Sequence, residues 1–541
     1  MFDKSRRPSL YQELTRLIYD VRRICPRLSL VGASVANPRY PIPAAHLELM
    51  AAIANDQRGE MPTGSDRSAR LLSIPPLFLI TQRWLWCLLA AVRDTLIIMY
   101  LKIRLWPLLK QMGQEPADVV MKTWCFGPGS LNSQSDFYYG VLPHLLEERG
   151  VSYLLLCGDL GGGSEKTFVQ AALRRDHIRS MPERVLVPAW APLVTAYQQM
   201  LTSFTLRRLA RNAKERKIGL IYAYACLDCL SPSTTRNTLY FYIARAAVKR
   251  WCPKVFLTLY EGQPWEIPAW HGAKAANKNC VIAGYQHTVI MPHSLSLTWP
   301  NQGSWELSAP DVVLCLGEAT RNMMKTGHET HGTKFIRFGS FRRNSSDSVP
   351  RPPMPGRQTI LILPIGIVDE AKLLFNFAMR LAPLLPDHRF IFRCHPLTPF
   401  ARIRPLLGGI PEEFPNIQIS NYPSMEDDFT RSSAVLYRGS STVLYAVLHG
   451  MKPIYLHDDD HPDVDPLFEV TSWRESVSST REMEHVLRRY AETTTDCAYK
   501  QWRSAMEYVD AYTTAVDENS IEQLLKALDL SGIDKDSRLH E

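Results

Sequence analysis

The sequence lacks the cysteine patterns that stabilise small secreted domains or bind zinc. Its eleven cysteines are an odd number and form one close pair, Cys226 and Cys229, without a second pair or a neighbouring histidine. This pattern favours buried, reduced thiols over a disulfide framework or a zinc site. No secretory signal is visible, because the first 25 residues are basic and are interrupted by Asp3, Glu13 and Asp20. These features predict a cytoplasmic protein.

The sequence also lacks an uninterrupted apolar run of the roughly 20 residues that a spanning helix needs. Residues 71–109 are its most apolar part, but they contain the charged residues Arg83, Arg93, Asp94, Lys102 and Arg104. On a helix, all of these except Lys102 fall within one arc of roughly 100°, and apolar residues fill most of the remainder. The pattern predicts an amphipathic helix at the membrane surface, with a helix pair packed against the protein body as the alternative.

The chain has no excess charge outside its first fifth. Residues 1–112 hold 16 Lys and Arg against 8 Asp and Glu, which accounts for the whole net charge of +8. A nucleic-acid-binding protein would carry a basic stripe on the domain that binds the nucleic acid, so this charge distribution argues against nucleic-acid binding. It favours attraction of a basic front end to anionic lipid, and therefore a peripheral protein on the inner face of the cytoplasmic membrane.

A chain of 541 residues is too long for one ordinary domain. Short apolar runs typical of buried parallel strands alternate with helical stretches from residue 117 onward. A first series lies at 118–124, 151–157, 184–190, 218–224, 254–262 and 280–287, and a second at 311–317, 334–340, 359–366, 388–396, 417–420, 434–440 and 452–458. This alternation predicts an α/β protein of two Rossmann-like domains facing a cleft.

The expected organisation has four parts. A basic helical region at 1–112 contains the membrane-surface segment, and a first Rossmann-like domain for the acceptor covers 113–308. A second Rossmann-like domain for the nucleotide covers 309–505, and a C-terminal helix and tail cover 506–541. The Ser/Pro-rich stretch 344–358 indicates a surface loop early in the second half.

Three short motifs each follow a predicted strand, where open α/β sheets bind their ligands. The first contains Glu261 and Gly262, and a carboxylate freed by a glycine turn can act as a general base. The second is Arg393-Cys394-His395-Pro396, in which the proline ends the strand and the histidine can donate to a phosphate. The third is Arg438-Gly439-Ser440-Ser441-Thr442, whose hydroxyls precede a helix and can bind an anion. Each motif alone is also compatible with a helix cap or a structural turn.

Together, and in this order, the motifs resemble those of bacterial two-domain (GT-B type) glycosyltransferases of surface polysaccharide biosynthesis. The similar enzymes are the CMP-sugar-dependent sialyl-, polysialyl- and Kdo transferases, and the CDP-glycerol glycerophosphotransferases are related to them. The resemblance covers roughly residues 117–500 and includes the stretches YEGQPWE and GYQH. It implies that Glu261 is the base, that His395 faces the nucleotide phosphate, and that Ser440, Ser441 and Thr442 bind phosphate or cytidine. Arg393, Pro396, Arg438 and Gly439 belong to the same expected nucleotide site.

One departure from this resemblance concerns the first motif, which usually has two acids before the glycine. Position 260 is Tyr, so His287 is a rival base and Asp136 a third candidate. Asp136, Gln286 and Trp265 are expected on the acceptor side, and the glycine-rich turn Gly161–Gly163 is expected to be a flexible acceptor-side loop. The acidic run at Asp458, Asp459, Asp460 and His461 indicates a solvated loop, and no metal or other cofactor is expected beside the nucleotide sugar.

The resemblance implies transfer of a sugar from a CMP donor to a glycan or glycolipid acceptor in capsule or lipopolysaccharide assembly. A 2-keto acid sugar such as sialic acid or Kdo is the expected donor sugar. Two alternatives are polyol- or sugar-phosphate transfer from a CDP donor, and a non-catalytic partner in polysaccharide assembly or export that kept the fold.

Overall fold

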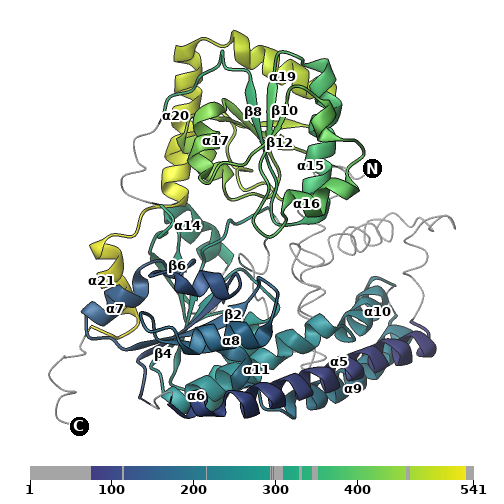
Figure 1. Cartoon of the computed structure of the whole chain (residues 1–541), viewed down its shortest axis with the longest axis vertical. Coiled ribbons are helices and arrows are strands. Elements are labelled where there is room, and N and C mark those ends of the chain that lie inside the picture. The colour runs from purple at the N-terminus through teal and green to yellow at the C-terminus, as the bar shows by residue number, and fades with distance from the viewer. Residues whose placement is uncertain are drawn as a thin grey trace.

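The computed structural model describes residues 75–111, 115–214, 216–292, 294, 297, 309–327, 332–343, 351–458 and 463–531. Two parallel α/β domains lie one above the other, and a long helical layer lies along the lower one (Figure 1). Most of the basic front end, with the residues before Pro75, is outside the described residues.

The first sheet has seven parallel strands in the order β3-β2-β1-β4-β5-β6-β7. Its strands are β1 Val119–Cys125, β2 Tyr153–Asp159, β3 Ser180–Pro182, β4 Val255–Leu259, β5 Val281–Tyr285, β6 Val312–Cys315 and β7 Lys334–Arg337. Its helices are η3 Pro128–Asn132, α7 Leu142–Glu148, α8 Glu165–Leu173, η4 Glu183–Leu186, α9 Ala191–Asn212, α10 Arg216–Cys229, α11 Pro232–Trp251, α12 Glu266–Ala276 and α14 Glu318–Gly327. The central strands β1 and β4 are almost fully buried, as expected for a sheet covered on both faces.

The second sheet has six parallel strands in the order β10-β9-β8-β11-β12-β13. Its strands are β8 Thr359–Leu363, β9 Arg389–Phe392, β10 Ile417–Ile419, β11 Ala434–Tyr437, β12 Lys452–Leu456 and β13 Glu475–Val477. Its helical segments are α15 Val368–Leu381, η6 Ala382–Leu384, α16 Phe400–Ile403, η7 Arg404–Leu406, η8 Pro411–Glu413, α17 Met425–Arg431, α18 Val443–Leu448 and α19 Thr480–Glu492. Two parallel sheets with alternating helices confirm the fold class expected from the sequence.

Two segments expected to be strands are not strands. Residues 218–224 lie within α10, because an apolar run of this length fits a buried helix as well as a strand. Residues 184–190 begin inside the 3-10 helix η4, and the strand β3 lies just before them. Arg184 there forms ion pairs with Glu165 and Asp94 and is not part of a sheet ladder.

The expected boundary between the two Rossmann-like domains, at 308/309, does not coincide with the division between the two sheets. The strands β6 and β7 pair with β5 and complete the first sheet, so the division falls between β7 and β8. Residues 344–358, partly outside the described residues, therefore lie between the two sheets.

The C-terminal helices return to the first domain. Helix α20, Thr495–Tyr512, packs on α18 of the second domain and on α14 of the first, and α21, Glu518–Ala527, packs against β7 (Figure 1). The Tyr512 hydroxyl accepts the Ile290 N–H, and the Thr514 N–H donates to the Leu316 carbonyl at 2.9 Å. These contacts tie the end of the chain to the first sheet.

The apolar segment 71–109 forms helix α5, Leu77–Arg104, followed by α6, Trp106–Gln111. The face of α5 that packs on the protein body is mainly apolar, with Ile80, Cys87, Ala91, Ile98 and Leu101 buried. Of the charged arc, Asp94 is buried against Arg184, whereas Arg83, Arg93 and Arg104 are exposed. The opposite side exposes an apolar stripe that includes Phe78, Leu85, Trp86, Leu89, Val92, Leu96, Met99 and Ile103. Helix α5 is long and apolar enough to cross a membrane by length and composition alone, although part of it is buried against the body.

Candidate functional site

The three sequence motifs lie at the carboxyl ends of parallel strands. Glu261 follows β4, His395 follows β9, and Ser440 follows β11. Strands β4 and β11 each lie at the point where the strand order of their sheet reverses, where open α/β sheets bind ligands, and β9 lies on the other side of β8 from β11.

Glu261 and His287, two competing candidates for the base, form one pair. The His287 Nε2 atom lies 2.8 Å from Glu261 Oε1, and the Gln263 side-chain amide donates to Glu261 Oε2 at 2.9 Å. The side chain of Glu261 is 22% exposed, whereas that of His287 is 7% exposed. The carboxylate is thus the more accessible member of the pair.

A second carboxylate, Glu266, holds the turn that carries Glu261. Its oxygens accept the backbone N–H groups of Glu261 at 2.8 Å and Gly262 at 3.0 Å. Gly262 has φ 75°, a conformation that side chains with a Cβ rarely adopt. Burial raises the pKa of Glu266 well above its ordinary value. The expected glycine turn is therefore present and is fixed by a buried acid.

Tyr138 and Arg342 lie beside this pair on the first domain. The ring of Tyr138 lies 4.7 Å from that of His287, and the Arg342 guanidinium lies 5.1 Å from the Tyr138 ring. Burial lowers the pKa of His395 in the second domain, and the charge of Arg342 lowers it further. We call Glu261, His287, Tyr138, Arg342 and His395 the interdomain site.

His395 is held in one orientation by its own loop. Its Nδ1 atom accepts the Leu397 N–H at 3.1 Å, so the proton of the neutral ring is on Nε2. Burial lowers the pKa of His395, and the positive charge of Arg342 lowers it further. A Cβ on Gly366 would lie 2.9 Å from His395 Nδ1, so only glycine leaves room for the ring. The neutral His395 is thus prepared to donate from Nε2.

The two arginines expected at the nucleotide are engaged elsewhere. Arg393 forms an ion pair with the fully buried Asp428 at 2.9 Å and donates to the Tyr422 carbonyl. Arg438 is 2% exposed and donates to the Leu456 carbonyl at 2.7 Å. Their guanidinium groups therefore bind the chain itself, and Arg342 is a cation whose charge acts on His395.

The hydroxyl motif after β11 precedes a short helix, α18. Ser440 is buried, while Ser441 and Thr442 are partly exposed. Gly439 needs no unusual backbone conformation, and its N–H faces Glu370 Oε1 at 3.4 Å. The same Glu370 oxygen accepts the Ile365 N–H, so one carboxylate joins the loops after β8 and β11. Pro396 lies in the turn in which the Thr398 N–H donates to the His395 carbonyl.

The three residues expected to contact the acceptor are buried in the first domain. Asp136 accepts the N–H groups of Tyr138 and Tyr139 at 2.9 and 2.8 Å, and burial raises its pKa. Gln286 is fully buried and accepts the Leu316 N–H. Trp265 is 4% exposed and packs edge-on against Trp124. Asp136 thus positions Tyr138, and all three have a structural role.

Tyr138 and Arg342 were missed from the sequence. Tyr138 stands two residues after the candidate Asp136, but neither an aromatic residue in a loop nor an arginine after a strand is a distinctive signal. Only the folded first domain brings Tyr138 against His287 and Arg342 against Tyr138.

Metal-binding potential is small in the described part of the chain. No group of three or more His, Cys, Asp or Glu residues there could hold a metal ion. Of the acidic run, Asp459, Asp460 and His461 lie outside the described residues. Cys226 and Cys229 are buried thiols that donate to the Ser203 and Gln199 carbonyls.

No family model matches the sequence, and no curated protein matches it. Solved structures with a similar fold include a glycotransferase of kitacinnamycin, 11% identical, which covers 76% of this chain and 99% of its own with a TM-score of 0.45. A glycosyltransferase from Rickettsia africae is 12% identical over 76% of this chain and 98% of its own, with a TM-score of 0.42. A UDP-GlcNAc 2-epimerase from Neisseria meningitidis bound to UDP-GlcNAc is 12% identical over 76% and 99%, with a TM-score of 0.40. The chain itself has two parallel sheets, of seven and six strands.

Proposed function

We propose that this protein is a glycosyltransferase that moves a sugar from a nucleotide donor to a glycan acceptor. The observation that carries the proposal is the interdomain site: ring contacts join the Glu261–His287 pair of the first domain to Tyr138 and Arg342, and the charge of Arg342 acts on His395 of the second. Transfer of a sugar needs a base at the acceptor hydroxyl and hydrogen-bond donors at the departing nucleotide phosphate. Glu261 is the candidate for the base, and His395 and Arg342 are the candidates for the donors.

In this reaction Glu261 removes the proton of the acceptor hydroxyl, because it is the more exposed member of its pair. The acceptor oxygen then bonds to the anomeric carbon of the donor sugar. The bond from that carbon to the phosphate oxygen breaks, and its electron pair leaves with the nucleotide. His395 Nε2–H and the Arg342 guanidinium stabilise the negative charge that develops there.

The proposed donor is a CMP-activated 2-keto acid sugar. The motif resemblance around Glu261, His395 and Ser440 supports it, whereas the epimerase of similar fold was solved with UDP-GlcNAc. Thermal unfolding of the full chain with CMP, CDP, UDP and GDP tests the donor base. Binding at 100 times Kd stabilises by about 2.7 kcal/mol, so the preferred nucleotide raises Tm most. Preference for UDP or GDP contradicts the CMP assignment, and no shift with any nucleotide contradicts the proposed function.

We also propose that the protein lies on the inner face of the cytoplasmic membrane. Helix α5 packs against α9, and α9 exposes a further apolar stripe of Leu193, Val194, Tyr197 and Phe204. Apolar stripes of this size on neighbouring helices are costly in water, and an adjacent basic segment attracts anionic lipid.

Flotation with anionic liposomes tests the membrane proposal. Replacement of Phe78, Leu89 and Leu96 with serine should release most of the protein from the liposomes. The matched control replaces Leu384 and Leu406, which are similarly exposed on the second domain, and should leave flotation unchanged. Equal flotation of the two variants would contradict attachment through α5.

A further inference from the structure

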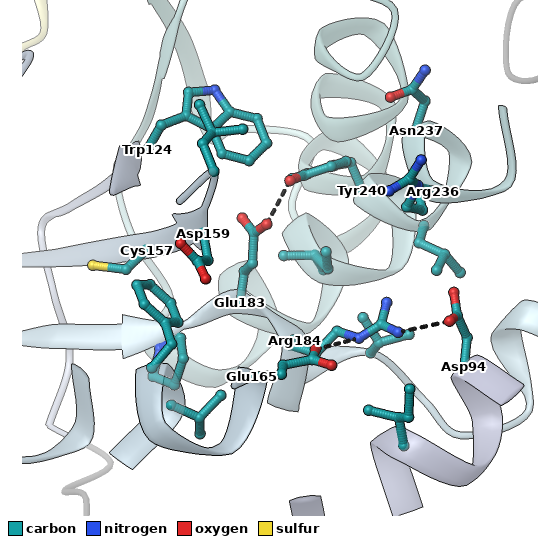
Figure 2. Close-up of a pocket in the computed structure, with 18 of the residues that line it drawn as sticks. Asp94, Trp124, Cys157, Asp159, Glu165, Glu183, Arg184, Arg236, Asn237 and Tyr240 are labelled. Atoms are coloured by element: carbon teal, nitrogen blue, oxygen red, sulfur yellow. Dashed lines mark hydrogen bonds and ion pairs between the residues drawn. The ribbon is translucent and has the colours of Figure 1, made fainter. Parts of the chain in front are cut away.

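A second pocket, separate from the interdomain site, lies beside helix α5. It has a volume of about 490 Å³ and is enclosed by α5, α8, η4, α11 and the ends of β1 and β2 (Figure 2). None of the five residues of the interdomain site lines it. Its volume is within the range of small-molecule sites in proteins.

The floor of this pocket is an ordered polar and aromatic cluster. The Tyr240 hydroxyl donates to Glu183 Oε1, and the buried Lys122 ammonium lies 3.1 Å from Glu183 Oε2 and 3.4 Å from the centre of the Trp124 ring. A Cβ on Gly158 would lie within 2.7 Å of both Glu183 and Trp124. Glycine at 158 therefore lets the floor residues reach their positions, and the pocket has a fixed shape.

The walls carry charges of both signs. Arg184 bridges Glu165 at 2.8 Å and Asp94 at 3.3 Å, and these groups lie together on one side in Figure 2. Asp159 lies at the end of β2, and Arg236 and Asn237 lie on α11 at the opposite side. Because acids and guanidinium groups alternate, neither an anion nor a cation gains from the whole pocket. A neutral sugar can bind across the whole pocket, because each of its hydroxyls both donates and accepts hydrogen bonds and the aromatic rings offer apolar faces.

The position of the pocket beside the exposed apolar stripe of α5 indicates a second property of the ligand. Arg93, Asp94 and Ile97 of α5 form one wall, and Val92 and Leu96 on the same two turns belong to the exposed apolar stripe. A ligand with a sugar head in the pocket can therefore lay an apolar chain along α5.

We propose that this pocket binds the neutral sugar nearest the lipid in a lipid-linked glycan. The growing end of the same glycan then extends to Glu261 in the interdomain site; Trp124 of the pocket lining packs on Trp265, four residues after Glu261. This inference rests on the proposed function, because it assigns the acceptor of that reaction. It also explains why a helix with an exposed apolar stripe forms part of a polar pocket.

Calorimetric titration of the full-length protein with hexyl β-glucoside tests the inference, with hexyl phosphocholine and hexanol as probes of equal chain length. Hexyl glucoside should bind at least ten-fold more tightly than either. The substitutions Arg236→Ala and Asn237→Ala should each weaken it at least five-fold, while Lys249→Ala, at an exposed position on the same helix outside the pocket, should not. Equal affinity for the three probes, or glucoside binding unchanged by both pocket substitutions, would overturn the inference.

The two proposals fail separately. Nucleotide-induced stabilisation should be the same in Arg236→Ala, Asn237→Ala and the unchanged protein, because the pocket lies outside the interdomain site. Loss of glucoside selectivity with normal nucleotide binding refutes only the pocket. Absence of any nucleotide binding refutes the proposed function, whatever the glucoside titration gives.

Discussion

The Nε2 atom of His287 lies 2.8 Å from Oε1 of Glu261, although 26 positions separate the two residues in the chain. The carboxylate can only accept, so the proton between them belongs to the imidazole. The contact gives the two residues different tasks. We propose that His287 orients and stabilises the carboxylate and that Glu261 meets the acceptor.

Substitutions at this pair distinguish the two tasks. Glu261→Gln removes the base and should lower kcat by 10²- to 10⁴-fold, the usual contribution of general base catalysis. His287→Gln retains an N–H donor near Glu261 and should keep more activity than His287→Ala. Initial rates with saturating donor measure both effects, and nucleotide-induced thermal shifts serve as the folding control. If His287→Gln were as inactive as Glu261→Gln, His287 would be the base.

Glycine at 366 is required by the position of His395. In Gly366→Ala the added Cβ would lie 2.9 Å from His395 Nδ1, and the ring should move away. We expect kcat/KM to fall about 10- to 100-fold, because a misplaced donor stabilises the leaving phosphate poorly. Gly408→Ala is the control, since its Cβ would meet nothing closer than 3.5 Å. Equal activity of the two variants would show that His395 does not contribute from this position.

Arg342 should control the titration of His395. Burial lowers the pKa of His395 below the ordinary value of 6.5, and the Arg342 charge lowers it further. In Arg342→Gln the pKa should therefore rise part of the way back, because the larger cause, burial, remains. Imidazole NMR signals, assigned with His395→Asn, measure the change. An unchanged pKa would place Arg342 too far from His395 to share a phosphate with it.

The same shift has a consequence for stability. Because the folded protein holds His395 neutral, the unfolded chain binds more protons at low pH. The contribution of His395 to stability is thus complete above pH 6.5 and is lost as the pH falls through the folded pKa. Arg342→Gln should reduce this loss, which thermal unfolding at pH 5 and pH 7.5 can detect.

Much of the fold was predictable because most strands are short apolar runs that end in glycine, proline or charged turns. Segments such as 254–259 and 388–392 have the pattern of a strand, whereas the apolar run 218–224 fits a helix and a strand equally. The domain boundary was not predictable in the same way. Nothing local in β6 or β7 says which sheet the strand joins, because strand pairing is decided by contacts distant in sequence.

The candidate site was predictable only in part. Its position at strand ends follows from the motifs, and Glu261 and His287 do come together, whereas His395 is related to them only through the charge of Arg342. The partners of Arg393 and Arg438 could not be predicted, because Asp428 and the Leu456 carbonyl approach them only in the folded sheet. A sequence motif shows that a cation is present, and the packing around it decides whether that cation remains available to a ligand.

Asp136, once a candidate for acceptor binding, should act through stability. Its Oδ1 atom accepts two backbone N–H groups, which an asparagine can also do, so Asp136→Asn should keep the loop that carries Tyr138. Asp136→Ala leaves those donors unpaired and should cost about 1–3 kcal/mol. Burial raises the pKa of Asp136, so the folded state favours the neutral acid, and this contribution to stability is lost as the pH rises through the folded pKa. The advantage of Asp136→Asn over the unchanged protein should therefore grow from pH 4 to pH 8 in thermal unfolding. An advantage that shrinks over this interval would mean that Asp136 is ionised in the folded protein and that its two amide donors outweigh its burial.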